Sequence, residues 1–237
     1  MDAHPEAPPQ VVLDLDVTGT PLHGHQEGRF FHGFYDEYCY LPLYIFCGDQ
    51  LLAVRLRQAN QDASAGSLQE VQRIVARLRN RWPKLKITLR GDPGFCREEL
   101  MRWCADNRVD YVFGLARNDR LHRRIAKAMR KAKAEAKRTG QAARVYTEFR
   151  YRTRESWSRA RRVIAKAEQI EGKENPRYVL TSLSASAWRP CALYEQLYCA
   201  RGEMENRIKE QMLLFADRMS AETMRANQLR LYLSAAA

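Results

Sequence analysis

Two short apolar runs that each end in an aspartate constrain the fold of this chain more than any other feature. The first, residues 11–16, is rich in β-branched side chains and predicts a buried strand that closes with Asp14 and Asp16. The second, residues 86–90, is followed at once by Gly91 and Asp92. Strand ends are rigid, and residues two apart on a strand face the same way. The chain is therefore expected to carry acidic side chains at the edge of a sheet.

The rest of the pattern places these two strands in a mixed sheet. Strands are predicted at 11–16, 40–47, 51–56, 86–90 and 110–115, and helices at 67–81 and 97–107. Three consecutive strands followed by alternating helices and strands predict an α/β fold, a mixed sheet flanked by helices.

The composition changes after residue 116. Residues 117–138 form a helical stretch rich in Lys and Arg, and strands are then predicted at 145–153, 161–167 and 177–183. Helices resume at 192–215 and 221–233. We therefore predict a flexible segment at 1–10, a core made of 11–116 and 191–233, and a β-rich insertion at 117–190 that is not a separate domain.

A third acid follows on the predicted helix at 192–215. Tyr198, Arg201, Glu205 and Lys209 are spaced by three, four and four residues, so they share one helix face. Cations one turn away on each side keep the Glu205 carboxylate ionised. A ladder of surface ion pairs would give the same spacing.

Two strand-end aspartates and a helical glutamate together predict a site for a pair of divalent cations, because carboxylate oxygens are the ligands such ions prefer. The candidate ligands are Asp16, Asp92 and Glu205, with Asp14 as a further ligand or an orienting group. Each has a structural alternative: Lys or Arg can neutralise the Asp14–Asp16 pair, and Asp92 can cap the helix that follows it.

The overall charge indicates a polyanionic partner. The chain has 40 Lys and Arg residues against 28 Asp and Glu, a formal net charge of +12. Such an excess favours nucleic acid. The longest apolar runs are too short to cross a bilayer, and the N-terminus is not typical of a signal peptide. Six cysteines without metal-ligand spacing indicate buried, reduced thiols in a cytoplasmic protein.

Five motifs together resemble the bacterial insertion-sequence transposases of the DDE superfamily, and specifically the insertion-sequence family numbered thirteen-eighty. They are Leu13-Asp14-Leu15-Asp16-Val17-Thr18, His23-Gly24-His25-Gln26-Glu27-Gly28-Arg29-Phe30-Phe31-His32-Gly33, Arg90-Gly91-Asp92-Pro93-Gly94-Phe95, Asp110-Tyr111-Val112-Phe113-Gly114-Leu115-Ala116 and Tyr198-Cys199-Ala200-Arg201-Gly202-Glu203-Met204-Glu205-Asn206-Arg207. The resemblance covers nearly all of residues 11–233.

The resemblance implies a ribonuclease-H-like core with a β-rich insertion before the last catalytic helix. It implies that Asp16, Asp92 and Glu205 hold two Mg²⁺ ions, for which Mn²⁺ can substitute, during DNA cleavage and strand transfer. It also implies that Tyr198 and Arg201 contact DNA near the cut.

A further basic residue is expected seven positions after the glutamate, where this chain has Met212, and Lys209 is the candidate substitute. By analogy Trp157, which lies among several arginines, would stack on a displaced base. A core role for this tryptophan is the alternative.

The implied partners are double-stranded transposon ends and target DNA, bound by a homodimer on the bacterial nucleoid, with no membrane partner. The resemblance also implies further regions upstream and downstream of this sequence. Two alternatives stay open: a truncated, non-catalytic derivative that binds DNA or transposase, and a glycosyltransferase that uses Asp14 and Asp16 for a metal–nucleotide-sugar complex.

Overall fold

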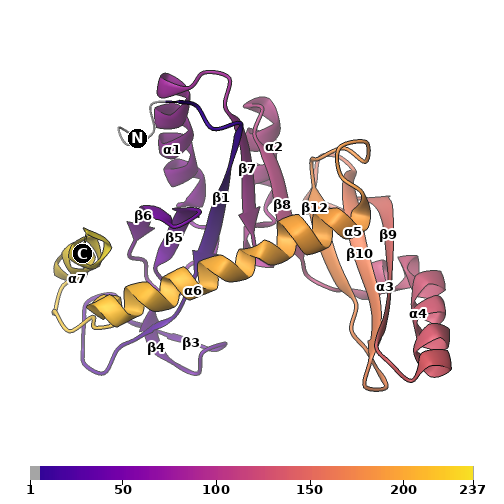
Figure 1. Cartoon of the computed structure of the whole chain (residues 1–237). Coiled ribbons are helices and arrows are strands. Elements are labelled where there is room, and N and C mark those ends of the chain that lie inside the picture. The colour runs from indigo at the N-terminus through magenta and orange to yellow at the C-terminus, as the bar shows by residue number, and fades with distance from the viewer. Residues whose placement is uncertain (1–5, 237) are drawn as a thin grey trace. The chain divides into compact units, whose positions relative to one another are not determined.

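The computed structural model describes residues 6–236, which divide into two compact units (Figure 1). Unit 1 comprises Met1–Arg90 and Arg201–Ala237, and unit 2 comprises Gly91–Ala200. Half of the N-terminal segment predicted to be flexible, residues 1–5, lies outside the described residues. The fold is mixed α/β with sheet strands flanked by helices, which confirms the predicted fold class.

The principal strands of unit 1 follow the order β7-β1-β5-β6. These strands are β1 (Gln10–Val17), β5 (Leu43–Cys47), β6 (Gln50–Arg55) and β7 (Lys86–Gly91). β1 pairs antiparallel with β5, so that Asp14 lies opposite Phe46 and Asp16 opposite Tyr44. Paired residues share a face of the sheet, and both aspartates therefore project toward the side of the two aromatic rings.

Unit 1 also contains a small second sheet, which shows that one predicted strand boundary is wrong. β2 (Thr20–Pro21), β3 (Phe30–His32) and β4 (Glu37–Tyr40) pair in the order β2-β4-β3. The sequence predicted one strand over residues 40–47. The chain instead leaves one sheet after Tyr40 and enters the other at Leu43, because Pro42 has no N–H with which to continue a ladder.

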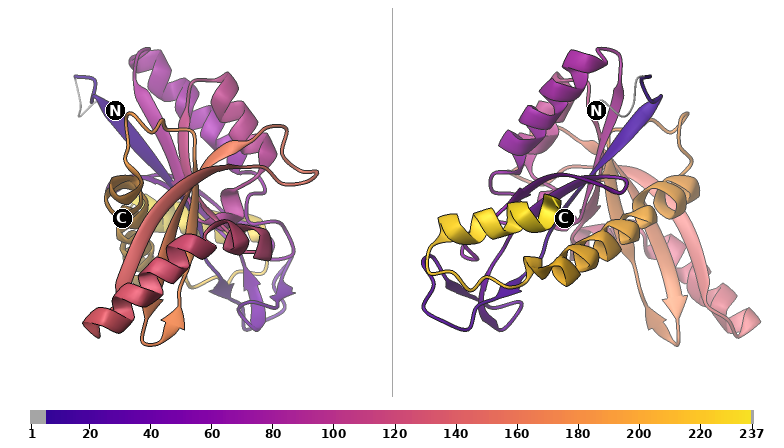
Figure 2. Two further views of the ribbon diagram at one scale, coloured as in Figure 1. Left: turned by 90° about the vertical axis from the view of Figure 1, so that its right-hand side faces the viewer. Right: turned by 60° about the vertical axis from the view of Figure 1, so that its left-hand side comes forward.

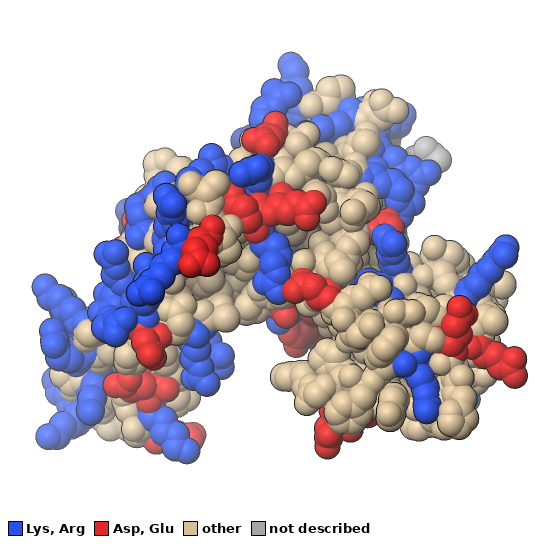
Figure 3. Space-filling model, turned by 180° about the vertical axis from the view of Figure 1, so that it is seen from behind, with Lys and Arg blue, Asp and Glu red and all other residues tan. Residues whose placement is uncertain are grey.

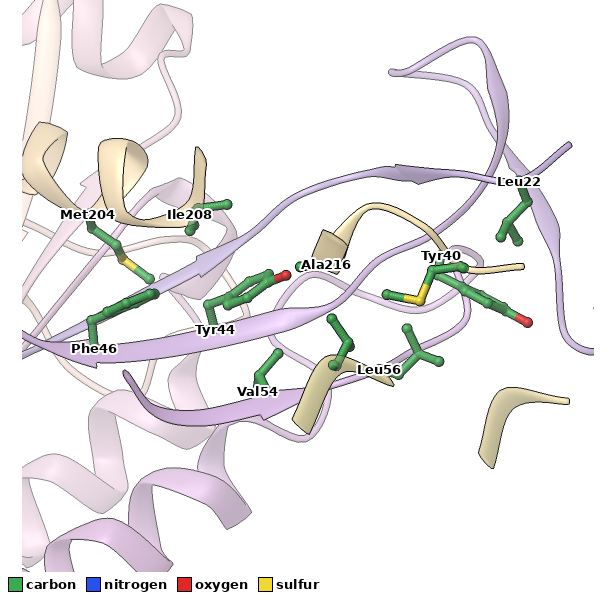
Figure 4. Close-up of a cluster of buried hydrophobic side chains, with 11 residues drawn as sticks. Leu22, Tyr40, Tyr44, Phe46, Val54, Leu56, Met204, Ile208 and Ala216 are labelled. Atoms are coloured by element: carbon green, nitrogen blue, oxygen red, sulfur yellow. The ribbon is translucent and has the colours of Figure 1, made fainter. Parts of the chain in front are cut away.

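Three longer helices belong to unit 1: α1 (Ser67–Arg81), α6 (Gly202–Gln211) and α7 (Met224–Ala236). α1 buries Val71, Ile74, Val75 and Leu78, which recur at helical spacing as predicted. Met204 and Ile208 of α6 join Tyr44 and Phe46 of β5 in one buried cluster (Figure 4). α6 therefore covers the sheet face that carries Asp14 and Asp16.

Unit 2 contains several strands, three of them in the segment predicted to be β-rich. The strands are β8 (Asp110–Leu115), β9 (Ala143–Tyr151), β10 (Arg161–Ile170), β11 (Lys173–Glu174) and β12 (Arg177–Thr181). Their order is β11-β10-β12-β8, and β9 pairs with β10. Because Tyr178 of β12 lies opposite Leu115 of β8, the later strands extend the sheet that β8 belongs to. The two units divide at Arg90 and Ala200, whereas the sequence placed the insertion at 117–190.

The basic helical stretch of unit 2 is two helices and not one. α3 (Asp119–Arg124) ends at Ile125, and α4 (Ala126–Thr139) begins directly after it. The buried Ile125 departs from helical backbone angles at this junction. α4 then runs along β9 and β10 (Figure 2). α2 (Glu98–Asp106) completes the longer helices of this unit.

The helix predicted at 192–215 contains three kinds of winding. A short α5 (Pro190–Ala192) leads into a π-helical run over Leu193–Tyr198 and a 3₁₀ turn over Cys199–Arg201, all before α6. After α6 a second π-helical run, Met212–Ala216, ends with Phe215 at a φ of 67°. A strict period of 3.6 residues therefore holds only over α6.

Two other expectations can be compared with the described residues. All six cysteines are free, but Cys191 and Cys199 are exposed, so the prediction of buried thiols is wrong for these two. Between residues 6 and 236 no helix combines the length and apolarity that crossing a membrane requires.

Candidate active site

In unit 1, Arg201 joins two of the predicted ligands, Asp16 and Glu205. Its Nη1 donates to Oδ2 of Asp16 at 2.9 Å, and its Nη2 donates to Oε1 of Glu205 at 2.8 Å. The Glu205 side chain is half exposed, whereas those of Asp16 and Arg201 are mostly buried. One guanidinium thus bridges a strand carboxylate and a helix carboxylate that are 189 positions apart in the sequence. The alternative given by the sequence, a ladder of ion pairs along one helix, therefore does not describe Arg201 fully, because one of its partners lies on a strand.

The packing of α6 on the sheet explains why these groups meet. Asp16 shares its sheet face with Tyr44, and Tyr44 packs in the cluster that contains Met204 and Ile208 of α6. Glu205 follows Met204 directly, so it emerges at the margin of this buried contact. Figure 4 shows Met204 above Phe46 and Ile208 on the same side of β5. The apolar cluster therefore fixes the position of α6 relative to β1, the strand that carries Asp14 and Asp16.

Asp14 has a different environment from Asp16. It is 4% exposed, and Nε and Nη2 of Arg90 donate to its two carboxylate oxygens at 2.5 and 2.7 Å. Burial raises the pKa of Asp14, and the hydrogen bonds from Arg90 oppose that rise. Of the two alternatives given by the sequence, an arginine counterion is the one observed at Asp14. Asp16 also accepts hydrogen bonds, from Arg201 and from the backbone N–H of Val17, but its side chain is more exposed than that of Asp14, so it is the better placed of the two to receive a cation.

The carboxylate oxygens of Asp16 and Glu205 are of the kind that a hard divalent cation prefers as ligands. Both are carboxylates, they converge on a single positive group, and Glu205 opens to solvent. Arg201 occupies the position of that positive charge. Within residues 6–236 no group of three or more His, Cys, Asp or Glu side chains gathers closely enough to hold a metal ion. The pair in unit 1 is therefore two carboxylates whose charge a single arginine neutralises only in part.

Asp92, the other predicted ligand, belongs to unit 2. It caps a short 3₁₀ turn over Pro93–Phe95, and its Oδ1 accepts the backbone N–H of Gly94 at 2.8 Å. The capping alternative raised by the sequence is thus observed, on this turn and not on α2, whose N-terminal residue Arg97 makes no side-chain cap. The cap holds the carboxylate in a fixed orientation while leaving it partly exposed.

Tyr198 lies next to this turn within unit 2. A side chain at Gly114 would place its Cβ 2.7 Å from the Tyr198 hydroxyl oxygen and 2.7 Å from Cδ of Pro93. The absence of a side chain at Gly114 therefore permits the tyrosine hydroxyl and the proline after Asp92 to approach the same point of β8. The structure thus brings Tyr198 close to the Asp92 turn.

Lys209, which is predicted to contact DNA, and Met212, which replaces an expected basic residue, have contrasting environments. Lys209 is exposed one turn after Glu205 on α6. Met212, which stands where the resemblance implies a basic residue, is half-buried and packs against the cluster around Tyr44. Position 212 serves the core in this chain, which leaves Lys209 as the available cation near that end of α6.

Trp157 is a core residue of unit 2. It is 4% exposed and meets Tyr151 edge to face, with ring centroids 5.8 Å apart. The guanidinium of Arg161 lies over its ring at 5.5 Å. With its faces occupied in this way, the ring is not available as a platform for a displaced base. The core alternative is therefore the one that the structure supports.

Sequence reasoning missed three residues that organise these sites. Arg90 was noted only as part of a motif, although it neutralises Asp14, and a buried acid on an interior strand signals a need for such a partner. Gly114 lies inside a strand pattern, and a glycine at such a position is a sign that another group approaches the backbone closely. Arg161 links β10 to Glu98 of α2 at 2.9 Å, a contact between distant segments that no local spacing reveals.

Comparison with known proteins identifies the family of the chain. The fold resembles that of the piggyBac transposase in its synaptic complex with hairpin DNA, with a TM-score of 0.53 and 12% sequence identity. The match covers 97% of this chain and 46% of that one, so the chain spans about half the length of the transposase. No curated protein matches the chain. The family model of the transposase DDE domain, group 1, matches residues 1–237, and the chain accordingly belongs to this family of DDE transposase domains.

Proposed function

We propose that this chain is the catalytic portion of a cut-and-paste DNA transposase, with Asp16, Asp92 and Glu205 as the ligands of two Mg²⁺ ions. The observation that carries the proposal is the convergence of Asp16 and Glu205 on the Arg201 guanidinium. Two carboxylates drawn to one cation from a strand and a distant helix form the kind of oxygen site that phosphodiester chemistry requires. Membership of the DDE transposase family supports the assignment.

The reaction is an in-line displacement at phosphorus. Water attacks a phosphodiester at the transposon end, the P–O bond to the 3′ oxygen breaks, and that oxygen leaves as a hydroxyl. In strand transfer the new 3′-hydroxyl attacks a target phosphodiester and displaces its 3′ oxygen in turn. The bound ions would activate the attacking oxygen and stabilise the leaving one.

The side chains of this chain have distinct roles in the proposal. Asp16, Asp92 and Glu205 supply the anionic oxygens. Arg201 holds two of them together before metal enters and then turns to a DNA phosphate, for which its planar guanidinium is suited. Lys209 binds a neighbouring phosphate, and Tyr198 donates its hydroxyl to the strand next to the Asp92 turn.

The narrower assignments form part of the same proposal. The motifs of the sequence favour the insertion-sequence family numbered thirteen-eighty, and hence a bacterial, cytoplasmic protein that joins the nucleoid when bound to DNA. Its partners would be double-stranded transposon ends and target DNA, engaged by a homodimer. The net charge of +12 supports a DNA partner.

The experiment titrates Mn²⁺ into the wild-type chain and the Asp92→Ala variant by calorimetry, and follows nicking of duplex DNA in parallel. We expect saturable binding and metal-dependent nicking that the variant loses. Asp106→Ala removes an exposed acid from α2 in the same unit and is the matched control. Nicking that survives Asp92→Ala unchanged would exclude this carboxylate from the site.

A second candidate function is a non-catalytic derivative that binds DNA or a transposase. The occupation of both Asp16 and Glu205 by Arg201 favours it, because a guanidinium that is never displaced would keep cations out. Tight duplex binding without nicking, at any Mg²⁺ or Mn²⁺ concentration, would identify this function.

A further inference from the structure

The surface formed by α3 and α4 of unit 2, here called the α3–α4 surface, concentrates the positive charge of the chain. Residues 117–138 contain ten Lys and Arg residues and two acids, Asp119 and Glu135. Figure 3 shows Lys and Arg side chains crowding around the part of unit 2 that holds these helices. A large share of the net charge of +12 therefore lies on one short segment.

The orientation of α4 turns this charge outward. The helix buries Ala128, Met129 and Ala132 against β9 and β10. At 100° per residue, Lys127, Arg130 and Lys137 lie on the side opposite that buried stripe, and all three are exposed. The array is held by a packed helix, so its spacing is fixed before any partner arrives.

Very little of this charge is neutralised by the protein itself. Glu135 pairs with Arg138 at 2.5 Å, and His122 lies 3.4 Å from Glu174. Among the described residues no acid forms an ion pair with Lys127, Arg130 or Lys137. A helix whose Lys and Arg residues served only solubility would ordinarily also carry Asp or Glu residues four positions away from them.

The same surface contains a hollow that is large enough to admit a phosphate group. A cavity of about 270 Å³ is lined by Arg120, Arg123, Arg124 and Tyr151. The guanidinium of Arg120 lies 5.3 Å from the centre of the Tyr151 ring, which keeps that side chain over the floor of the hollow. Three guanidiniums around one concave spot would bind an anion better than three on a convex surface.

The chemistry of the surface distinguishes duplex from single-stranded nucleic acid. Single strands are held by aromatic rings on which bases stack. Residues 117–139 contain no Phe, Tyr or Trp, and Tyr151 is buried beneath Arg120. From Lys127 to Lys137 the helix extends about 15 Å, a length over which duplex DNA carries roughly nine phosphate charges.

We propose that the α3–α4 surface docks on the sugar–phosphate backbone of duplex DNA, with one phosphate seated in the hollow beside Arg120, Arg123 and Arg124. The contact is independent of base sequence, because it offers charges and no groups that read base edges. The proposal deepens the proposed function and depends on it only for the identity of the polyanion. It assigns DNA binding to a surface that contains none of the predicted metal ligands.

The test measures binding of a random-sequence duplex in EDTA, where cleavage cannot occur, over a range of salt concentrations. The variant is Lys127→Glu/Arg130→Glu/Lys137→Glu. The control, Arg77→Glu/Arg81→Glu/Lys84→Glu, reverses three exposed cations on and just beyond α1 of unit 1 and removes the same charge. Circular dichroism verifies that both variants are folded.

Only the α3–α4 variant is expected to lose affinity strongly, with the slope of log K against log salt becoming shallower by about 2.7 for three lost phosphate contacts. Equal losses in the two variants would show that net charge alone acts, and an unchanged slope would show that the surface makes no contact. Tighter binding to single-stranded DNA than to duplex would also overturn the proposal. A chain that binds duplex as expected but never nicks it in Mg²⁺ would contradict the proposed function and leave this inference intact.

Discussion

Arginine has opposite roles in two regions of this molecule. Around β1 and α6 of unit 1, Arg90 pairs with one carboxylate and Arg201 with two, and each holds together elements that are distant in the sequence. On the α3–α4 surface of unit 2, the cations project away from the sheet and have few acidic neighbours. The first group is part of the fold, whereas the second is available to a partner.

The comparison shows that a net charge is a poor guide to a binding surface until each cation has been matched with its neighbours. Arg90 contributes nothing to the outward field because Asp14 cancels it within hydrogen-bonding distance. Lys127 and Arg130 contribute fully. If this distinction holds, variants of the first group change stability, and variants of the second group change DNA affinity.

The largest effect on stability is expected at the buried pair. Arg90→Met leaves the Asp14 carboxylate buried without a partner and should lower the free energy of unfolding by about 3–5 kcal/mol. Urea denaturation measures this. The double variant Asp14→Leu/Arg90→Met removes both charges and should recover most of the loss. A double variant as unstable as the single one would mean that the pair has a role beyond mutual neutralisation.

A smaller effect, of about 1–3 kcal/mol, is expected for Arg201→Met, because Glu205 is half exposed and Asp16 is more exposed than Asp14, so water screens both pairs more than the pair at Arg90. The same substitution should tighten Mn²⁺ binding in the absence of DNA, since the competing cation has gone. Thermal unfolding and calorimetry give the two quantities. Unchanged or weaker Mn²⁺ binding would contradict the idea that Arg201 occupies the cation position.

The smallest effect concerns acid stability in unit 2. Burial raises the pKa of Glu98, but hydrogen bonds from Arg161 and Ser158 outweigh it and hold the pKa below its ordinary value of 4.5. A lowered pKa in the folded state gives stability that is present above pH 4.5 and is lost as the pH falls through the folded value. Arg161→Met should therefore flatten the stability curve below about pH 4.5. If the stability of the variant fell as steeply with decreasing pH as that of the wild type, the loss of stability in acid would come from other carboxylates.

Much of the fold was accessible from the sequence because its periodicity is strong. The helix at residues 67–81 and the strand at 110–115 match the structure to the residue. The failures have both local and tertiary causes. Pro42 interrupts a strand, the buried Ile125 breaks a helix, and π-helical winding before α6 interrupts the period on which the Tyr198 face was predicted.

The candidate site was predictable only in part. The residue types and their positions at strand and helix ends pointed to carboxylate chemistry, and the pairing of Arg201 with Glu205 followed from helical spacing. The second partner of Arg201, Asp16, could not be derived, because it depends on how α6 packs over β1. A core role for Trp157 was one of two alternatives given by the sequence, and deciding for it required the contacts with Tyr151 and Arg161 from two paired strands.

Gly114 gives unit 2 an unusual sensitivity to mutation. Most strand positions tolerate a range of side chains, but here even a methyl group would meet the Tyr198 hydroxyl and the ring of Pro93 at 2.7 Å. Every codon change that replaces this glycine must therefore displace Tyr198 or the turn that presents Asp92. A single missense change at a position without any functional group of its own can thus disturb Tyr198 and the Asp92 turn, two parts of the predicted site, at once.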